Sequence, residues 1–372
     1  MTDFPNTYDV AVIGGGPIGL SAAYEVAKQD HSVVVLERNN FFNQAGSSGD
    51  LPRMFRTMYT EEFMADLALE SIDSWKNLEK DAGENLRLMT GLLNFGDPNY
   101  RPGGPEGTLL DPIKNLDRLK MKYEKLSKDN IEDRYPFRQL PDEYVGIHAP
   151  DNGVINVPLL VRTLYRLCRD KGASLKEYTH VRRLEPDGQG WNICATEKGF
   201  PVAYHARKII ITCGAYVNHI LRPSFNVQLQ LDIWEMVASY WSLKAGSDGT
   251  KFPSMWFQFQ GDVNGKSQLF YGFPALPWGP PDVARIAVDA ATRHIEDPDD
   301  RSPSQVCADD IANTRLKDMA INGGSSYARP EFSISRRDPD GNRLLKEYPS
   351  RADTKAGILS QEPAQGSSIS NA

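Results

Sequence analysis

The sequence predicts an α/β protein in which a Rossmann-like dinucleotide-binding domain with a parallel sheet is joined to a second, α+β domain with a mixed or antiparallel sheet. Three observations predict this class. A short apolar run near the N-terminus leads directly into a glycine-rich turn and a helix with small apolar residues. Aromatic segments typical of an antiparallel sheet follow in the second half. The 372 residues suffice for about two domains.

The first strand is predicted at Val10–Ile13, whose four apolar residues have the composition of a buried parallel strand. Gly14, Gly16 and Gly19 follow it and complete a G-x-G-x-x-G pattern. Gly14 permits a tight turn, Gly16 lets backbone approach a pyrophosphate, and Gly19 lets the next helix pack on the strand. The unpaired N–H groups and the dipole at the start of that helix favour a diphosphate.

A second strand at 32–36 ends in Glu37, about twenty residues beyond the glycines. A carboxylate at this position can accept both hydroxyl groups of an adenosine ribose. A glycine triplet alone is weak evidence, but strand, triplet, helix, strand and terminal acid occur here in register. The N-terminal segment therefore predicts a site for an ADP-containing dinucleotide.

Hydrophobic periodicity predicts the remaining elements. A long helix at 61–82 is expected to place Phe63, Leu67, Trp75 and Leu78 on one face. Residues 337–372 are rich in polar residues and are predicted to form a disordered tail. Strands are predicted at 173–184, 190–196, 208–216, 233–242, 255–260, 268–273 and 283–289.

Composition and charge exclude several classes of protein. The net charge of −7 argues against a nucleic-acid surface, and no apolar stretch is long enough to span a bilayer. The N-terminus lacks a secretory signal and the last residues do not match the peroxisomal S-K-L address, so an intracellular, cytoplasmic protein is expected. No metal site is predicted, because no metal-type spacing occurs among Cys168, Cys194, Cys213 and Cys307.

Four segments, together with the dinucleotide fingerprint, resemble the monomeric sarcosine oxidase family of FAD-dependent amine oxidases, within the D-amino-acid-oxidase-like superfamily. Ser47–Arg56 resembles the loop beside the flavin, and 149–155 resembles the segment that crosses between the domains. Residues 211–216 are similar to the second glycine strand, and 270–274 to a strand at the substrate pocket. Their order over residues 8 to 300 makes the match specific.

The resemblance implies a discontinuous FAD-binding domain at 1–88 and 154–225, with a remnant at 316–336. A substrate domain would then occupy 89–153 and 226–315. The implied reaction oxidises the C–N bond of a secondary or N-methylated amino acid to an imine, which water hydrolyses to an aldehyde or keto product. The flavin carries the redox chemistry, with hydrogen peroxide formed if oxygen is the acceptor. A monomer with a small amine or amino-acid substrate is expected.

The resemblance also assigns site residues. Arg56 matches an arginine that clamps the substrate carboxylate, and its planar guanidinium suits that role. Tyr271 matches a pocket tyrosine, although a core aromatic is an equally open interpretation. Arg285 stands where family oxidases place a lysine that helps oxygen react. The residues expected to contact FAD are Ile13, Gly14, Gly16, Pro17, Ile18, Gly19, Glu37, Arg38, Ser48, Gly49, Asp50, Arg53, Val181, Cys213 and Gly214.

Three positions depart from the family pattern. Ser48 stands where the family often has a histidine, and Asp289 replaces a pocket histidine. Arg285 keeps the positive charge of the family lysine, but its pKa is too high for it to titrate. These departures leave the electron acceptor open between oxygen and another oxidant.

A further departure concerns the C-terminal part. In the family, a strand with the cysteine that bonds the flavin follows the helix near residue 310, whereas here 309–315 runs directly into 316–324, which resembles the end of the last helix. That piece is therefore expected to be missing and FAD to be non-covalent. Two alternatives stay open: a catalytically impaired nucleotide-binding remnant or truncated gene product, and an NAD-dependent dehydrogenase. The aromatic strands of the substrate half weigh against the second.

Overall fold

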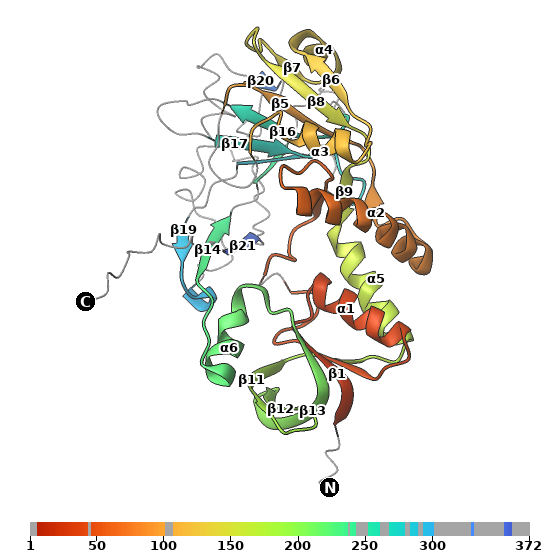
Figure 1. The fold of residues 1–372 in the computed structure, drawn as a ribbon, viewed down its shortest axis with the longest axis vertical. Helices are drawn as coiled ribbons and strands as arrows, with labels where there is room; N and C mark the ends of the chain where they lie inside the picture. Colours follow the sequence, from red (N-terminus) through yellow and green to blue (C-terminus); the bar gives the residue numbers. More distant parts are fainter. Residues whose placement is uncertain are drawn as a thin grey trace, which may run out of the picture.

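The computed structural model is built from two large sheets that lie at opposite ends of the molecule (Figure 1). One sheet is mostly parallel and the other is mixed, so the predicted α/β class is confirmed. Among the helices of the described ranges, none is long and apolar enough to cross a membrane. The structure describes residues 6–43, 46–100, 107–236, 239–242, 252–260, 268–279, 283–288, 293–300, 329–330 and 353–358.

The first sheet has six strands in the order β10-β2-β1-β13-β12-β11. β10, β2, β1 and β13 run parallel, whereas β12 and β11 extend the sheet in antiparallel fashion. The parallel strands are apolar on both faces, as a sheet that is covered on both sides requires. The strands are β1 (Thr7–Ile13), β2 (Val33–Leu36), β10 (Ser174–Lys176), β11 (Thr179–Pro186), β12 (Trp191–Glu197) and β13 (Phe200–Ile211).

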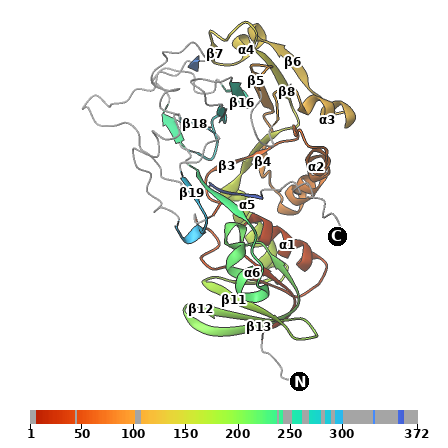
Figure 2. The same cartoon turned by 60° about the vertical axis from the view of Figure 1, so that its left-hand side comes forward.

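Helices cover both faces of this sheet (Figures 1 and 2). α1 (Pro17–Lys28) and α5 (Val157–Asp170) pack together against the face that carries Val10 and Val12. α6 (Asn218–Phe225), which follows the short 3₁₀ helix η1 (Gly214–Val217), covers the opposite face. The carboxyl ends of the central parallel strands are left between the two helical layers, where α/β folds bind their ligands.

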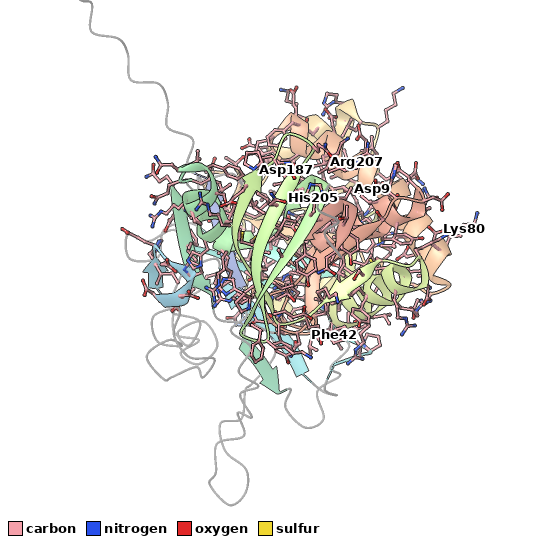
Figure 3. The ribbon with its side chains drawn as sticks, turned by 90° about the horizontal axis from the view of Figure 1, so that it is seen from below. Asp9, Phe42, Lys80, Asp187, His205 and Arg207 are labelled. Carbon is pink, nitrogen blue, oxygen red and sulfur yellow. The ribbon has the colours of Figure 1, made fainter. Side chains whose placement is uncertain are left out.

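Ion pairs hold the outer end of the six-stranded sheet together (Figure 3). Arg207 on β13 pairs with Asp9 on β1 at 3.2 Å. His205 pairs at 2.9 Å with Asp187, which lies in the turn between β11 and β12. The N–H of Gln189 also donates to Asp187 and is the main reason that the pKa of this carboxyl lies below its ordinary value. These contacts fix the turns opposite the ligand-binding end of the sheet.

The second sheet has seven strands in the order β15-β18-β17-β16-β5-β8-β6. β16 and β5 pair in parallel and the other neighbours are antiparallel, so the sheet is mixed as predicted. α3 (Pro112–Arg118) lies in the chain between β5 and the edge strand β6, and α4 (Lys128–Arg134) follows β6. The strands are β5 (Leu92–Gly96), β6 (Glu124–Ser127), β8 (Val145–Ala149), β15 (Ser239–Ser242), β16 (Met255–Gln260), β17 (Gln268–Gly272) and β18 (Val283–Val288).

A small sheet of β3 (Pro52–Phe55), β9 (Gly153–Asn156) and β4 (Arg87–Leu88) lies between the two large sheets (Figure 2). The adjoining helix α2 (Glu62–Ala82) forms where predicted, but its predicted apolar face is only half correct. Trp75 and Leu78 pack against the core, whereas Phe63 and Leu67 are 68% and 58% exposed. Helical geometry explains the exposure of Phe63, because Trp75 lies roughly 120° around the helix from it. The helix buries Ala65 and Ala68 instead.

The predicted strand at 233–242 is wrong as a single element. It divides into β14 (Leu231–Met236) and β15, and β14 pairs with β19 (Arg293–Ile295) and β21 (Asp353–Ile358) in a separate sheet. The predicted disordered tail is corrected at β21, because strand pairing uses backbone groups that a polar segment also possesses. Within 337–372, the structure describes residues 353–358, and the other residues lie outside the described ranges.

The remaining C-terminal segment that the structure describes is β20 (Arg329–Pro330), which pairs with β7 (Phe137–Arg138). β20 belongs to the predicted 316–336 remnant of the FAD-binding domain, yet it pairs with a segment of the substrate half. The domain boundaries themselves remain predictions.

Candidate functional site: a nucleotide cavity and a charged sheet face

A cavity of about 770 Å³ opens at the carboxyl ends of β1, β2 and β13. The start of α1, the loop before β3 and the first turns of α5 complete its walls. Twelve of the fifteen residues expected to contact FAD line it: Ile13, Gly14, Gly16, Pro17, Ile18, Glu37, Arg38, Ser48, Asp50, Val181, Cys213 and Gly214. Gly19, Gly49 and Arg53 are not among the lining residues.

The glycine turn is shaped by close backbone approaches. Gly14 has a φ of +103°, and a Cβ there would lie 2.6 Å from the carbonyl oxygen of Thr212. A Cβ at Gly19 would lie 1.9 Å from the carbonyl oxygen of Gly14, so Gly19 fixes the approach of α1 to the turn. Gly16 is the N-cap of α1 and provides no side-chain cap, which leaves the first N–H groups of the helix suited to a diphosphate.

Glu37 is fixed at the end of β2 and is 8% exposed. Its Oε2 accepts a hydrogen bond from the N–H of Gly15 at 2.7 Å, and its Oε1 accepts one from the N–H of Asn39 at 2.8 Å. A carboxylate has about four acceptor positions, so both oxygens can still accept ribose hydroxyl groups. Together with the glycine turn, this fixed acceptor fits the adenosine half of FAD.

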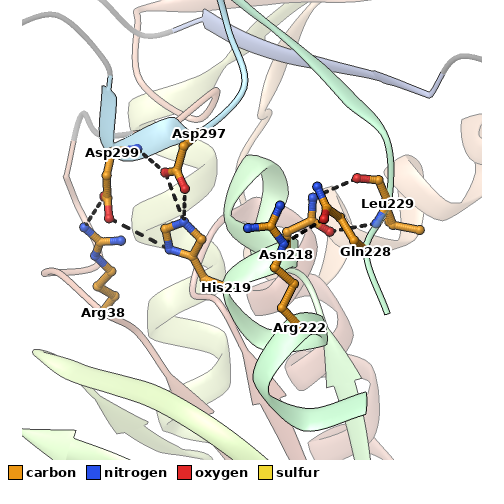
Figure 4. A network of polar contacts seen from close by, with 8 residues as sticks. All are labelled: Arg38, Asn218, His219, Arg222, Gln228, Leu229, Asp297 and Asp299. Carbon is orange, nitrogen blue, oxygen red and sulfur yellow. Dashed lines mark hydrogen bonds and ion pairs between the residues drawn. The ribbon is translucent and has the colours of Figure 1, made fainter. Parts of the chain in front are cut away.

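Arg38 and His219 come together at one wall of the cavity (Figure 4), which Tyr216 also lines. The Arg38 guanidinium lies over the Tyr216 ring, 4.6 Å from its centroid, and its Nη2 pairs with Asp299 at 2.8 Å. The Nε2 of His219 lies 3.0 Å from both carboxylate oxygens of Asp297. Sequence reasoning identified Arg38 but neither acidic partner, because both follow β19 in a distant part of the chain.

Two lining side chains are kept neutral by their surroundings. Burial is the main cause that lowers the pKa of His180 to about 4, and the charge of Arg182 adds to it. Burial and the charge of Glu37 raise the pKa of the Cys213 thiol to about 12. Cys213 is therefore a protonated thiol at neutral pH and a poor nucleophile.

The loop before β3 is organised by Arg53. Its guanidinium donates to the carbonyl oxygens of Ser47, Gly49 and Pro52, with Gly49 at 2.8 Å and Pro52 at 2.9 Å. It also lies 3.3 Å from the carboxylate of Asp50. In the structure Arg53 thus holds the loop that forms a cavity wall, and its predicted contact with the flavin stays a prediction.

Asp50 links this loop to the seven-stranded sheet. Its side chain is fully buried and pairs with the guanidinium of Arg285 on β18 at 2.8 Å. Its backbone has a φ of +89°, in the region that residues other than glycine rarely adopt, although Asp and Asn tolerate it best. Strained backbone of this kind persists where surrounding contacts hold it and is common at functional sites.

The predicted catalytic residues meet on one face of the seven-stranded sheet. Tyr271 on β17 pairs in register with Phe257 on β16, and their ring centroids are 5.7 Å apart. The Arg56 guanidinium lies 5.5 Å from the Phe257 centroid, and that of Arg285 lies 5.5 Å from the Tyr271 centroid. A row of contacts therefore runs from Arg56 across two aromatic rings to Arg285 and on to Asp50 in the cavity wall.

Several lining residues were missed by the sequence analysis. Phe41, Arg162, His180, Tyr216 and His219 all line the cavity. His180 and Tyr216 stand next to or near predicted residues, so strand position was a usable signal for them. Arg162 on α5 and His219 on α6 carried no signal, since each is one polar residue of an amphipathic helix. Asp289 and Cys307, singled out in the sequence, lie outside the described residues.

Comparison with known proteins identifies the family of this chain. The model of the family described as "FAD dependent oxidoreductase" (DAO) matches residues 9–311. A putative bifunctional amine oxidase of Dictyostelium discoideum is 48% identical over 325 residues, which cover 83% of this chain and 29% of that protein. The human peroxisomal sarcosine oxidase is 29% identical over 349 residues, which cover 92% of this chain and 84% of that protein.

A solved structure supports the same assignment. The open form of NikD, described as an unusual amino acid oxidase essential for nikkomycin biosynthesis, superposes with a TM-score of 0.73 at 32% identity, and the match covers 83% of this chain and 76% of NikD. The resemblance to sarcosine oxidases inferred from the sequence is thus confirmed. This chain spans about 29% of the length of the Dictyostelium relative. It belongs to the DAO family of FAD-dependent oxidoreductases.

Proposed function

We propose that the protein uses FAD to oxidise the C–N bond of a secondary or N-methylated amino acid. The product is an imine, which water hydrolyses to an aldehyde or keto compound. Support comes from the amine and sarcosine oxidases among its relatives and from the amino acid oxidase NikD among its structural neighbours. The substrate is a small molecule, and the protein acts as a monomer that binds neither nucleic acid nor membrane.

The observation that carries this proposal is the row of Arg56, Phe257, Tyr271 and Arg285 beside the cavity wall. The Arg56 guanidinium presents a planar pair of donors that suits the carboxylate of an amino acid. The rings of Phe257 and Tyr271 supply an apolar surface that orients the carbon bearing the nitrogen and limits access of water. The Tyr271 hydroxyl adds a polar group to the same row of side chains.

Gly14, Gly16 and the start of α1 would hold the diphosphate of FAD, and Glu37 would hold its ribose. When bound, FAD would supply the acceptor for a hydride from the substrate carbon. We infer that the cofactor is bound without a covalent link. Cys213 is the cysteine that lines the described cavity, and its raised thiol pKa makes it a poor nucleophile toward the flavin.

Arg285 bears on the choice of electron acceptor. It places a permanent positive charge next to the cavity wall, and that charge would stabilise a developing anion. Asp50 lies 2.8 Å from the guanidinium, however, and offsets much of this charge. Oxygen and another oxidant are both accommodated by this arrangement, and hydrogen peroxide forms only with oxygen.

The first experiment is an absorption spectrum of the purified protein before and after acid precipitation. Flavin bands that pass into the supernatant support a non-covalent FAD site. N-methyl amino acids are then tested for substrate-dependent flavin bleaching without air, and for peroxide with air. A protein that stays colourless after incubation with FAD contradicts the proposal and favours an impaired remnant.

An Arg56→Lys variant tests the site. It keeps the charge but loses the planar pair of donors, so KM should rise at least tenfold, as expected for a lost charge-assisted hydrogen bond. Arg183→Lys is the matched control, because Arg183 is exposed and pairs only with Glu185 among the described contacts. An unchanged KM for Arg56→Lys would remove Arg56 from substrate binding.

A further inference from the structure

The acidic turn that follows β19 reaches two residues of the nucleotide cavity. It begins at Asp297, continues through the 3₁₀ helix η2 (Pro298–Asp300), and is held by the Asp299 N–H, which donates to Oδ1 of Asp297 at 2.8 Å. Figure 4 shows its carboxylates facing Arg38, which follows β2, and His219 on α6. The turn is therefore joined to both layers of the cavity wall by charged contacts.

Arg38 is constrained from two sides. Asp299 accepts a hydrogen bond from its Nη2 at 2.8 Å, and the guanidinium carbon lies over the Tyr216 ring, 4.6 Å from the ring centroid. The remaining terminal nitrogen, Nη1, is buried and has no hydrogen-bond partner among the described residues. Nη1 is therefore out of reach of a ligand, and any contact between Arg38 and a ligand must use the exposed part of its side chain, which lines the cavity.

His219 supports the same arrangement. The Nε2 of His219 lies 3.0 Å from both carboxylate oxygens of Asp297, and the Nδ1 of His219 lies 3.9 Å from Asp299. The Asp299 N–H is the main cause that lowers the pKa of Asp297, and His219 adds to it. His219, Asp297 and Asp299 have atoms that could ligate a metal ion within 4.8 Å of one another. A metal ion is not needed to balance Asp299, because Arg38 already pairs with it.

We propose that Asp299 and Asp297 are positioning residues for the cofactor. Asp299 orients Arg38 so that the part of its side chain that lines the cavity contacts the adenosine half of FAD, and Asp297 fixes His219 beside it. This inference rests on the proposed FAD site. Glu37, the residue before Arg38, is already held by two backbone N–H groups. The two neighbours therefore have complementary roles, since Glu37 accepts hydrogen bonds from the adenosine half and Arg38 places a positively charged side chain beside it.

The acidic turn follows a strand that is connected to the substrate half. β19 pairs with β14, and β14 leads to β15 of the seven-stranded sheet, while β18 of that sheet precedes β19. The acidic turn is therefore one place where the segment formed by β14 and β19 contacts the nucleotide half. Because coupling is reciprocal, a cofactor whose affinity depends on the pair of Asp299 and Arg38 must in return stabilise that pair.

The test measures the dissociation constants of FAD, ADP and FMN for flavin-free protein, by flavin fluorescence and by competition. Asp299→Asn should weaken FAD and ADP by about tenfold and leave FMN unchanged, because FMN lacks the adenosine half. Asp299→Glu should recover most of the affinity. Glu296→Gln is the matched control, as Glu296 is an exposed acid of the same segment with no contact to Arg38 among the described residues.

The outcomes separate the two proposals. Wild-type protein that binds no FAD contradicts the proposed function itself. Wild-type protein that binds FAD, with an Asp299→Asn variant that binds FAD and ADP equally well, overturns only the positioning role. Equal weakening of FMN and FAD also overturns it, because that pattern indicates general disruption. If Asp299→Asn does not fold, Arg38→Gln carries the same test and the same expected selectivity.

Discussion

Two ion pairs of this protein have the same length but opposite surroundings. Arg285 and Asp50 pair at 2.8 Å with side chains that are 3% and 0% exposed. Arg38 and Asp299 also pair at 2.8 Å, with side chains that are 35% and 54% exposed. The first joins the substrate sheet to the cavity wall and the second joins the acidic turn to the nucleotide end.

The difference shows that the N–O distance does not determine how much an ion pair contributes to the stability of the fold. Taking both charges of a buried pair out of water costs several kcal/mol each, and this cost is offset only while both partners are present. A half-exposed pair is screened by water and salt, so it contributes about 0–1 kcal/mol. The buried pair should therefore govern folding, and the exposed one should govern what the cavity binds.

The largest effect is expected for Asp50→Asn. It removes one partner of the buried pair while asparagine still tolerates the φ of +89°. Arg285 is left as a buried charge with a weakened partner, so the free energy of unfolding should fall by about 3–5 kcal/mol. Urea unfolding of flavin-free protein, followed by circular dichroism, measures this loss.

A double variant provides the control. Asp50→Asn combined with Arg285→Met removes both charges, while Arg53, whose side chain is 27% exposed, can keep its hydrogen bonds to the loop carbonyls. This variant should regain a large part of the lost stability, because an apolar side chain has no charge to desolvate. A double variant that is as unstable as the single one would show that the pair is not the source of the effect.

A second effect concerns pH at the nucleotide end. Burial lowers the pKa of His180 to about 4, aided by Arg182, Arg38 and His219 and opposed by Asp299. The unfolded chain, with a histidine pKa near 6.5, therefore binds more protons than the folded chain between about pH 4 and 6.5. Stability should be fully present above about pH 6.5 and fall as the pH drops toward 4.

His180→Asn should flatten this part of the stability curve, measured as the urea midpoint at several pH values. His31→Asn is the control, because His31 is an exposed histidine outside the cavity. An unaltered pH dependence in His180→Asn would mean that other groups control the acid loss of stability.

The nucleotide half was predictable because its signals are local. The strand, the glycines and Glu37 occur within thirty residues of each other near the N-terminus, and the cavity brings them together as expected. Arg56, Tyr271 and Arg285 were found only through the family resemblance, since an arginine or a sheet tyrosine has no periodicity of its own. Their place on one sheet face depends on strand register, which composition does not encode.

The contacts between distant segments were not predictable. Arg38 and Asp299 are 261 positions apart, and nothing near either residue indicates its partner. The division of 233–242 into two strands of different sheets had the same origin, because the partners of β14 are chosen by tertiary packing. Arg53 was predictable in part. The sequence motif assigned it to the loop before β3, and the structure adds that its guanidinium donates to carbonyl oxygens that hold this loop together.

The smallest effect on stability is expected for Asp299→Asn. Because the pair with Arg38 is half exposed, its loss should lower the free energy of unfolding of flavin-free protein by less than about 1 kcal/mol, and less still in high salt. Glu62→Gln is a matched control that breaks the exposed pair with Lys114, which lies outside the cavity. Both variants should unfold at nearly the same urea concentration, while only Asp299→Asn loses FAD affinity. A stability loss as large as that of Asp50→Asn would contradict the comparison, because it would mean that exposure does not separate a pair that supports folding from one that positions a ligand-binding residue.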